Sequence, residues 1–565
     1  MISIQEKILL VLLPFWSPLI PPMGISCLKS FLLKHRCEVK CADFNIVEPL
    51  RELYDYYFDT LRGYVPKDKH GNLYSIGQDV LRNHLMAHIN HVDENENEYS
   101  ELVKVILYKT FYFEIGNELV DRLNKIVLEF YIRLGQYFIE LLEREKPAVL
   151  GLSVFNGTLP ASIFVARLTR DKYPNIKIYM GGGVFADQMA MGTPNLDFFL
   201  EKTVGYIDKI FIGEGEILLL KLLRGDLPGG QRVYRANDID WEMLAINSVN
   251  IPDFSDFDTR LYPYLGAYSS RSCPFQCSFC SETIQWGPYR KKSSEQIVKE
   301  LFELYQKYNY QLFFMSDSLL NPVITDIAEE FLKNSQSIYW DACIRIDRNA
   351  CDPRRTILWR RGGFYRARIG IESGSQRLLN LMDKRIYVEE IKEALASLAF
   401  AGIKTSTLWI VGHPEETEED FQQTLDLIEE LKDFIYDVEG TPFWYHLDGQ
   451  VNSSQWLKQY KRALLYPENA REMLISQTWI VDCEPHREEI YRRLNRLVKH
   501  LHRLGIPNPY TMQEILQADM RWQKLHKNAV PTLLEFKDNY IDENKRVKEF
   551  EFGRNTIQKD ANFSF

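Results

Sequence analysis

The segment Cys273-Pro274-Phe275-Gln276-Cys277-Ser278-Phe279-Cys280 decides how the rest of this sequence is interpreted. Three of the nine cysteines lie here, with the spacing CxxxCxxC. An odd number of cysteines in a chain of 565 residues is not typical of a disulfide framework. Three thiolates this close together can share one cubane iron–sulfur cluster and leave one iron open to another ligand. A zinc site completed by a distant histidine is the alternative.

The sequence around this segment alternates between strands and helices. Strands are predicted at 266–270, 312–315, 339–346, 366–371, 404–410 and 434–445, and helices at 294–308, 375–382, 388–401 and 417–432. Six strand–helix repeats predict a partial (β/α)6 barrel over residues 263–449 rather than a closed barrel of eight repeats. The helical pattern after it predicts a helical C-terminal domain, residues 450–565, with helices at 454–465, 485–504 and 511–526.

An earlier strand–helix series occupies residues 1–225. Apolar runs predict strands at 7–13, 38–43, 148–154, 176–180 and 209–212, the last taken as the final strand of its sheet. Such alternation indicates an α/β fold with a doubly wound parallel sheet. Residues 49–145 are predicted to be a helical insertion, and 226–262, rich in Asp and Pro, a linker.

Composition narrows the function classes. Aromatic residues make up 13% of the chain, too much for a disordered protein. Lys and Arg number 68 against 78 Asp and Glu, a net charge of −10, which argues against a nucleic-acid partner. No apolar run reaches the roughly 18 residues of a membrane span. We therefore expect a cytoplasmic protein that acts on a small molecule or peptide, without a membrane partner.

The cysteine motif carries a resemblance to a known family. CxxxCxxC after the first barrel strand, with an aromatic residue (Phe279) before the third cysteine, resembles the radical SAM superfamily. The resemblance implies that Cys273, Cys277 and Cys280 hold a 4Fe-4S cluster and that S-adenosylmethionine (SAM) binds its open iron. It also implies a 5′-deoxyadenosyl radical, made with an electron from a donor such as flavodoxin or ferredoxin.

Further segments resemble the SAM-binding parts of this family. They are Ser316 and Asp317 after the second barrel strand, Arg345 after the third, Glu372-Ser373-Gly374 after the fourth, and Gly412-His413 after the fifth. Asp317 and Glu372 are acceptors suited to ribose hydroxyls or the SAM ammonium group. The alternative for both carboxylates is a structural role in capping or ion pairing.

Four loops of the N-terminal series resemble a cobalamin-binding domain that precedes many radical SAM barrels. These loops contain Pro22 and Gly24, Ser153, Gly181-Gly182-Gly183 and Gly213-Glu214-Gly215-Glu216. Small residues at strand ends let the backbone approach a flat macrocycle closely. The motif DxHxxG, which supplies a histidine to cobalt, is missing. Either cobalt has no histidine ligand, or the domain keeps the fold without cobalamin.

The last predicted barrel strand ends in Tyr445 and His446, which could act as proton donor or acceptor for a substrate. A packed strand without a catalytic role is the alternative. The sequence as a whole favours cobalamin-dependent methyl transfer to an unactivated carbon, or to phosphorus, of a natural product or peptide. A radical SAM enzyme that cyclises, rearranges or oxidises its substrate is a second hypothesis. A non-catalytic iron–sulfur scaffold with a degenerate SAM site is a third.

Overall fold

The computed structural model describes residues 6–91, 96–236, 246, 251–334, 338–447, 454–526, 529–530 and 532–533. The chain divides into two compact units. The first consists of Met1–Tyr262, Phe279–Gly287 and Trp444–Cys483, and the second of Pro263–Ser278, Pro288–Phe443 and Glu484–Phe565. Each unit contains one six-stranded parallel sheet, which confirms the predicted α/β class with two parallel sheets. The predicted barrel end at residue 449 lies outside the described residues.

The sheet of the first unit has the strand order β2-β1-β3-β4-β5-β6. Its strands are β1 (Ile8–Leu12), β2 (Val39–Asp43), β3 (Val149–Ser153), β4 (Lys177–Gly181), β5 (Lys209–Ile212) and β6 (Val233–Arg235). Every residue of β1 is buried, as expected for a strand covered on both faces. The strand order reverses between β1 and β3, where doubly wound sheets bind their ligands.

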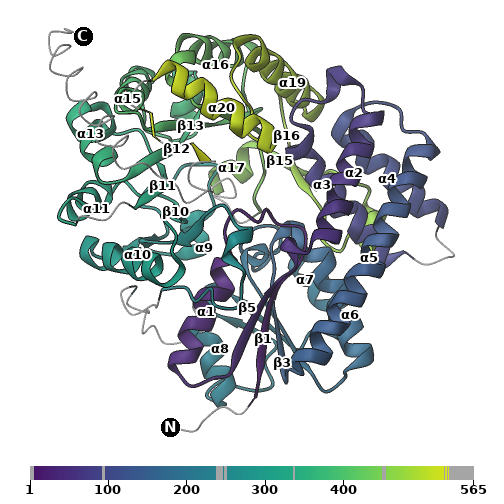
Figure 1. The fold of residues 1–565 in the computed structure, drawn as a ribbon. Coiled ribbons are helices and arrows are strands. Elements are labelled where there is room, and N and C mark those ends of the chain that lie inside the picture. The colour runs from purple at the N-terminus through teal and green to yellow at the C-terminus, as the bar shows by residue number, and fades with distance from the viewer. Residues whose placement is uncertain are drawn as a thin grey trace, which may run out of the picture. The chain divides into compact units, whose positions relative to one another are not determined.

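Helices cover both sides of this sheet. They are α1 (Met23–Lys34), α6 (Leu159–Lys172), α7 (Pro194–Lys202) and α8 (Gly215–Arg224). Helices α1 and α8 pack against each other on one side of the strands, and α6 lies on the other (Figure 1).

The segment between β2 and β3 is helical, as predicted. It contains α2 (Glu48–Tyr64), α3 (Leu73–Asn90), α4 (Glu96–Phe111) and α5 (Asn117–Glu145). Helix α3 contacts α4, α5 and α6, so the insertion packs onto the sheet's own helical layer (Figure 1). The side chain of His84, on α3, is fully buried and forms hydrogen bonds with Tyr57 on α2 and Asn124 on α5.

One prediction about this sheet was wrong. Strand β5 is not the last strand, because β6 pairs with it in parallel at Ile210↔Val233 and lies within the predicted linker. The strand has only three residues between polar segments, so no hydrophobic period marks it in the sequence. The rest of the predicted linker lies partly outside the described residues.

The sheet of the second unit has the order β14-β13-β12-β11-β10-β7, and its neighbours are parallel. Its strands are β7 (Leu265–Ala267), β10 (Leu312–Met315), β11 (Tyr339–Ile344), β12 (Phe364–Glu372), β13 (Lys404–Val411) and β14 (Asp437–Pro442). The end of the first predicted strand forms a separate strand, β8 (Ser270–Arg271), paired with β9 (Arg290–Lys291). Six parallel strands in sequential order agree with the predicted partial barrel.

Helices separate these strands, and α9 of the first unit follows the third cysteine. They are α9 (Glu282–Trp286), α10 (Ser294–Tyr308), α11 (Ile324–Phe331), α12 (Arg348–Cys351), α13 (Pro353–Arg361), α14 (Gln376–Leu381), α15 (Val388–Phe400) and α16 (Glu418–Glu430). Helix α10 has the predicted bounds. Its Ser293 side chain caps it by accepting a hydrogen bond from the Gln296 amide, which satisfies one exposed N–H of the first turn.

The C-terminal region is only partly helical. Helices α17 (Ser454–Gln459), α18 (Arg471–Leu474), α19 (Arg487–Leu504) and α20 (Met512–Leu525) form, but the predicted helix at 454–465 was wrong in its second half. Lys461–Leu464 is strand β15, paired antiparallel with β16 (Trp479–Asp482). The pairing partner lies about fifteen residues further along the chain, and cross-strand hydrogen bonds outweigh the local helical preference.

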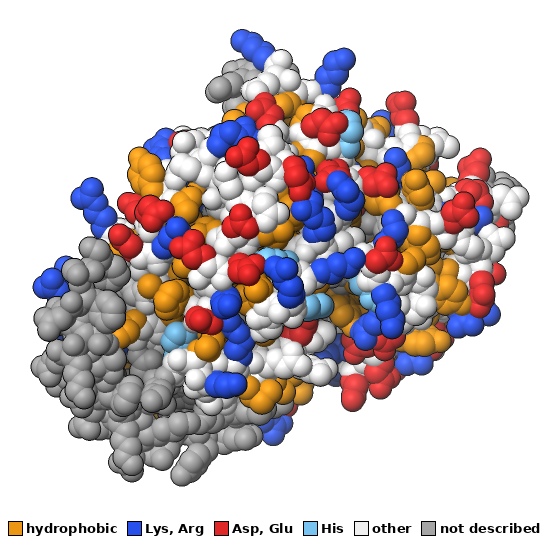
Figure 2. All heavy atoms as spheres, turned by 90° about the horizontal axis from the view of Figure 1, so that it is seen from above, with side chains coloured by type: hydrophobic (Ala, Val, Ile, Leu, Met, Phe, Trp, Pro, Cys, Tyr) orange, Lys and Arg blue, Asp and Glu red, His pale blue; other side chains and the backbone are white. Residues whose placement is uncertain are grey.

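No helix among the described residues is long and apolar enough to cross a membrane. On the face of the molecule in Figure 2, acidic and basic side chains are interspersed rather than sorted into one basic patch. That surface offers no extended positive area for a nucleic-acid backbone. The expected lack of a nucleic-acid partner stays a prediction.

Candidate functional site

The cysteine loop follows β8. Cys277 is buried, and Cys273 and Cys280 are half-buried. Burial raises the pKa of Cys273 above its usual value, and the neighbouring Cys277 adds to the increase. The amide of Ser278 donates to the Met382 carbonyl at 2.8 Å and so ties the loop to the end of α14. Cys273 and Cys277 belong to the second unit and Cys280 to the first.

Arg345 lies beside the second cysteine. Its Nη1 is 3.6 Å from the Sγ of Cys277, and its guanidinium stacks 4.0 Å above the Phe275 ring. The side chain of Asn321 fixes the backbone of Arg345. It accepts a hydrogen bond from the Arg345 amide and donates one to the Arg345 carbonyl. Arg345 is 6% exposed, and its Nη2 is buried without a hydrogen-bond partner. Leaving a buried cationic donor unpaired costs folding free energy. We therefore expect the Nη2 atom to donate a hydrogen bond to a ligand.

Asp317 is engaged within the protein. It is 4% exposed and accepts hydrogen bonds from the Ser269 amide and hydroxyl and from the Ser270 hydroxyl. Burial raises the pKa of Asp317, although the hydrogen bonds from the two serines oppose this. These contacts join the ends of β7 and β10, which is a structural use of the carboxylate. The neighbouring Ser316 has an exposed side chain and donates its amide to the Ala267 carbonyl.

Glu372 forms a buried ion pair with Lys384. Its Oε1 lies 2.6 Å from the lysine Nζ, and both side chains are about nine-tenths buried. Glu372 has a positive φ of 69°, and the pairing of β12 with β13 shifts register next to it. A Cβ on Gly370 would lie 2.4 Å from the Glu372 carboxylate, so this glycine gives the side chain its space. A carboxylate already paired with lysine has fewer free lone pairs for SAM.

Ser373 and Gly374 pack against α16. The Gly374 amide donates to the Thr424 hydroxyl at 2.9 Å, and the Ser373 hydroxyl lies 3.3 Å from the same oxygen. A Cβ on Gly374 would approach the Gln423 carbonyl oxygen to 2.5 Å, so only glycine fits. The resulting turn presents backbone rather than bulky side chains at the end of β12.

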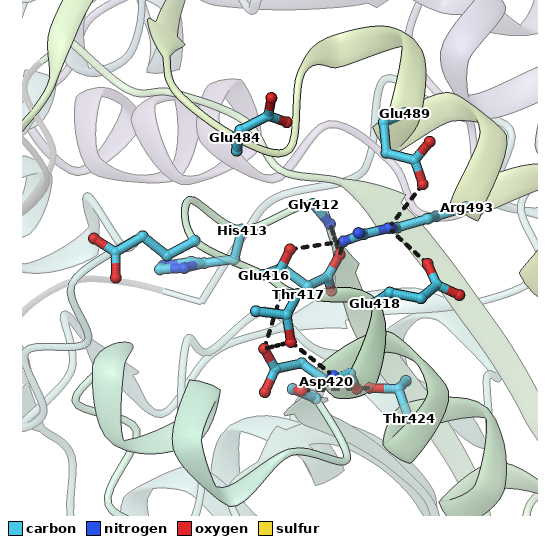
Figure 3. Close-up of polar contacts among 12 residues, drawn as sticks. Gly412, His413, Glu416, Thr417, Glu418, Asp420, Thr424, Glu484, Glu489 and Arg493 are labelled. Atoms are coloured by element: carbon cyan, nitrogen blue, oxygen red, sulfur yellow. Dashed lines mark hydrogen bonds and ion pairs between the residues drawn. The ribbon is translucent and has the colours of Figure 1, made fainter.

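The loop after β13 is braced by an ion pair that the sequence analysis missed (Figure 3). Glu416 accepts from the Gly412 amide at 2.9 Å and from Arg493 Nη1 on α19 at 2.8 Å. Gly412 has a φ of 79°, and a Cβ there would collide with Ile490. No sequence motif marks Arg493, because it lies 77 residues from its partner on a basic helix.

Burial sets the charges of this loop. It lowers the pKa of His413 to about 4, so its imidazole is neutral near pH 7. Burial raises the pKa of Glu416 to about 7, and the contact with Arg493 limits the rise. His413 is fully buried against Phe443, with its Nδ1 2.9 Å from the Pro414 carbonyl. Its contact with SAM stays a prediction.

The small residues of the first unit gather at the carboxyl ends of its strands. Pro22 is the N-cap residue of α1, and Gly24 lies so near the end of β3 that a Cβ there would be 4.0 Å from Ser153 Oγ. Gly182 has a φ of 125° and packs directly on the Val154 backbone, and Gly183 lies against the Phe155 ring. Gly24 and Gly182 are exposed, so the backbone of their two loops is accessible at this edge of the sheet. The Gly181 strand end belongs to the same edge.

The fourth glycine loop follows β5. Gly213 has a φ of 91° and is exposed, and Glu214 is the N-cap residue of α8. Gly215 lies against Leu28 of α1, and Glu216 is buried in the first turn of α8. This loop reaches the same edge of the sheet, because parallel strands end together.

An exposed aromatic pair at this edge escaped the sequence analysis. Trp16, in the loop after β1, stacks on Phe155, in the loop after β3, with ring centroids 4.1 Å apart. The Trp16 side chain is 46% exposed although its amide is held by Asn45. The proximity of two aromatic residues 139 positions apart could not be recognised from either segment alone.

Tyr445 and His446 belong to the first unit rather than to the barrel unit. Tyr445 is 5% exposed, and burial raises the pKa of its hydroxyl. His446 Nδ1 lies 2.7 Å from Asp187 Oδ1. Burial lowers the pKa of His446, but the hydrogen bond and charge of Asp187 outweigh it and raise the pKa above the usual value. Their catalytic role stays a prediction.

Among the described residues, no three His, Cys, Asp or Glu side chains are gathered closely enough to hold a metal ion. The donor chemistry of the cysteine loop nevertheless fits an iron–sulfur cluster, since three thiols lie on one short loop beside a guanidinium. The glycine edge fits a flat ligand, because Gly24, Gly182 and Gly213 are exposed and have no side chain to hold a ligand away from the backbone. Ligation by Cys273, Cys277 and Cys280 stays a prediction from their spacing.

Comparison with known proteins identifies the barrel unit. Residues 268–428 match the family model of the radical SAM superfamily. An uncharacterized methyltransferase of Pyrococcus horikoshii is 23% identical over 330 residues, 54% of this chain and 69% of the relative. The anaerobic magnesium-protoporphyrin IX monomethyl ester cyclase of Rubrivivax gelatinosus is 23% identical over 307 residues, 49% of this chain and 53% of the cyclase.

A solved structure matches nearly the whole chain. The radical SAM methyltransferase TsrM from Kitasatospora setae, solved with cobalamin and a 4Fe-4S cluster, aligns over 99% of this chain and 100% of its own, with a TM-score of 0.59 and 13% identity. At this identity the match establishes the fold. The family match confirms the resemblance that the cysteine motif carries, since residues 268–428 match the model of the radical SAM superfamily.

Proposed function

We propose that this protein is a cobalamin-dependent radical SAM enzyme that transfers a methyl group to an unactivated carbon, or to phosphorus, of a natural product or peptide. The supporting observation is the combination on one chain of a three-cysteine loop within the radical SAM domain and a parallel sheet with glycine-containing loops along its carboxyl edge. Methyltransferases among the relatives add to this support.

The proposal assigns each cofactor to residues of this chain. Cys273, Cys277 and Cys280 hold the cluster. The strand ends at Arg345, at Ser373-Gly374 and at Gly412 contact SAM. The edge formed by Gly24, Ser153, the 181–183 loop and the 213–216 loop receives cobalamin. When bound, the cluster supplies the electron that cleaves SAM, and cobalamin supplies the methyl carrier.

The protein's own residues position and insulate these groups. Arg345 brings a positive charge within 3.6 Å of the Cys277 sulfur. The buried pair of Glu416 and Arg493 holds the Gly412 loop at the end of β13. The loop from Pro14 to Gly24 contains no histidine, so we propose that cobalamin has no imidazole ligand from this chain.

The proposal also covers the substrate, the electron donor and two carboxylates of the second unit. The substrate is a small molecule or peptide, and a cytoplasmic electron donor such as flavodoxin or ferredoxin supplies the reducing equivalent. Glu372 keeps SAM in place through Lys384 and the turn that follows it, and Asp317 fixes the end of β10.

The experiment that tests methyl transfer uses SAM with a deuterated methyl group. Anaerobically reconstituted enzyme is incubated with candidate substrates and reductant. Product that carries the label, with 5′-deoxyadenosine and S-adenosylhomocysteine formed together, supports methyl transfer. Formation of 5′-deoxyadenosine with an unlabelled product contradicts it.

A second candidate is radical cyclisation, rearrangement or oxidation without methyl transfer. Two anaerobic magnesium-protoporphyrin IX monomethyl ester cyclases among the relatives favour it, at 23% and 29% identity over 49% and 39% of this chain. The unlabelled outcome of the same experiment supports this candidate. A non-catalytic scaffold would give neither labelled product nor 5′-deoxyadenosine.

A further inference from the structure

The first unit contains a cavity of about 270 Å³ with polar and charged residues and Trp444 in its walls, and none of the predicted cofactor residues lines it. Its walls come from α3, from the loops after β3 and β4, from His446 and from the segment before β16. The lining side chains used below are Asp79, Arg82, Asn156, Asp187, Gln188, His446 and Gln477. The insertion therefore contributes to a site, since α3 belongs to it.

Arg82 is the unusual member of this wall. It is 4% exposed, and its Nη1 donates to the Ser476 carbonyl at 3.1 Å and to the Asn83 side chain. Its Nε and Nη2 are buried without a hydrogen-bond partner. Burial lowers the pKa of Arg82 below its usual value, because the charge is removed from water. Buried guanidinium donors are normally paired, so this edge of Arg82 lacks an acceptor.

The two unpaired nitrogens lie on one edge of the guanidinium, and this edge binds both oxygens of a carboxylate side-on. The same chain uses it in that way elsewhere. Arg260 donates from Nε at 2.8 Å and from Nη2 at 2.7 Å to the two oxygens of Asp258. Arg385 binds Asp383 in the same manner, at 2.8 and 2.9 Å. The unpaired Nε and Nη2 edge of Arg82 therefore has the geometry that binds a carboxylate.

The carboxylates in the cavity wall are held by other partners. Asp79 accepts from the Tyr466 hydroxyl at 3.2 Å, and Asp187 binds His446 at 2.7 Å. Among the described residues, no ion pair joins Arg82 to either of them. A ligand with only a negative charge would meet their repulsion as it approached Arg82. A ligand that also carries a positive charge would not.

The cavity also offers acceptors for such a positive group. The side-chain oxygens Asn156 Oδ1, Gln188 Oε1 and Gln477 Oε1 belong to its walls and are buried without a hydrogen-bond donor. An ammonium group has three N–H donors and no acceptor, which matches a wall of amide oxygens and carboxylates.

We infer that this cavity binds the zwitterionic end of an α-amino acid, with its carboxylate on the Nε and Nη2 edge of Arg82 and its ammonium on the facing oxygens. If the proposed function holds, the ligand is the substrate or its recognition end. Only this identification of the ligand as the substrate rests on the proposed function. The binding itself requires neither the cluster nor SAM.

The test measures binding of the twenty common L-amino acids to the full-length protein by ligand-observed NMR, at up to about 10 mM, where a site with a dissociation constant near 1 mM is filled. Each amino acid that binds is compared with its methyl ester and with the amine that lacks the carboxylate. We expect the acid to bind about 10- to 100-fold more tightly than either analogue, as for loss of hydrogen bonds to a charged group. Absence of binding by every amino acid, or equal binding of acid and ester, overturns the inference.

Variants locate the site. Arg82→Gln should weaken amino-acid binding by the same factor, and Arg82→Lys, which keeps the charge but loses the two-pronged edge, should weaken it less. Arg260→Gln is the matched control, because the Arg260 side chain lies in the same unit and is 86% exposed. Unchanged binding by folded Arg82→Gln contradicts the assignment. If that variant does not fold, the comparison of acid and ester on the unaltered chain still decides.

The test separates this inference from the proposed function. Amino-acid binding without methyl transfer would retain the cavity assignment and reject the reaction. Methyl transfer to a substrate without an amino-acid end, together with no binding in the NMR test, would reject the cavity assignment and retain the reaction.

Discussion

The strand ends of the two units are built in different ways. In the first unit, exposed glycines lie at the start of α1 and after β4 and β5, and the packing leaves no room for a side chain at Gly182. In the second unit, buried charged groups fix the corresponding loops, as Lys384 does for Glu372 and Arg493 for Glu416. Backbone edges suit a large flat ligand, whereas fixed charges suit a small polar one that must be oriented. We therefore expect the first unit to be sensitive to side chains added at its glycines and the second unit to be sensitive to the loss of a buried charge.

The largest expected effect is on the cysteine loop. Replacing Cys273, Cys277 and Cys280 together by Ala should abolish iron–sulfur binding, about four irons per chain, and SAM cleavage, because no other cysteine lies on this loop. Iron and sulfide content and the ultraviolet–visible spectrum measure the first, and 5′-deoxyadenosine the second. Cys351→Ala is the matched control, as a half-buried cysteine outside the loop in the unit that contains Cys273 and Cys277. Retained iron and cleavage in the triple variant would show that the cluster assignment is wrong.

The next effect tests the backbone-built edge. Gly182→Ala should destabilise the protein by about 2–5 kcal/mol, because a Cβ would lie 2.5 Å from the Val154 carbonyl oxygen at a φ of 125°. Gly24→Ala, at the start of α1 with its nearest contact at 4.0 Å, should change stability by less than about 1 kcal/mol. Urea denaturation compares the two variants. Equal loss of stability would remove the distinction between a tight and an open glycine on this edge.

The third effect tests the charge-built edge. Glu372→Ala should cost about 3–5 kcal/mol, because Lys384 loses its carboxylate in a buried site. It should also weaken SAM binding by a factor of roughly 10 to 150 if the carboxylate orients SAM. The double variant Glu372→Ala/Lys384→Met removes both charges and should recover stability. Recovery of SAM affinity along with stability would mean that Glu372 is only structural.

The smallest effect is a pH dependence. Burial raises the folded-state pKa of Glu416 to about 7 from 4.5, so the folded protein holds a proton that the unfolded chain releases between these values. The stabilisation from this proton on Glu416 is complete below pH 4.5 and is lost as the pH rises to 7. The free energy of unfolding should fall by about 1–3 kcal/mol over this range, after allowance for the favourable contact with Arg493.

Glu416→Gln should flatten that part of the stability profile, measured by urea denaturation between pH 5 and pH 8. Glu418→Gln is the control, because Glu418 is half-exposed and Arg496 holds its pKa below the usual value. An unchanged slope for Glu416→Gln would show that Glu416 titrates in its ordinary range.

Some of this protein was determined by sequence alone. The apolar run of β1, the strand–helix alternation and the spacing of Cys273, Cys277 and Cys280 are local patterns, and they predicted the α/β class, both parallel sheets and the radical SAM domain. Local patterns suffice where neighbouring residues share one environment, as in a strand buried on both faces.

The tertiary structure decided what depends on residues far apart in the chain. Strand β6 forms because β5 supplies its pairing partner, and β15 forms because β16 does. The partner of Glu416 is 77 residues away, and the cavity at Arg82 forms only when α3 meets Trp444, His446 and residues 476–478. Pair contacts and cavities arise from the packing of whole elements, so no window of sequence contains them.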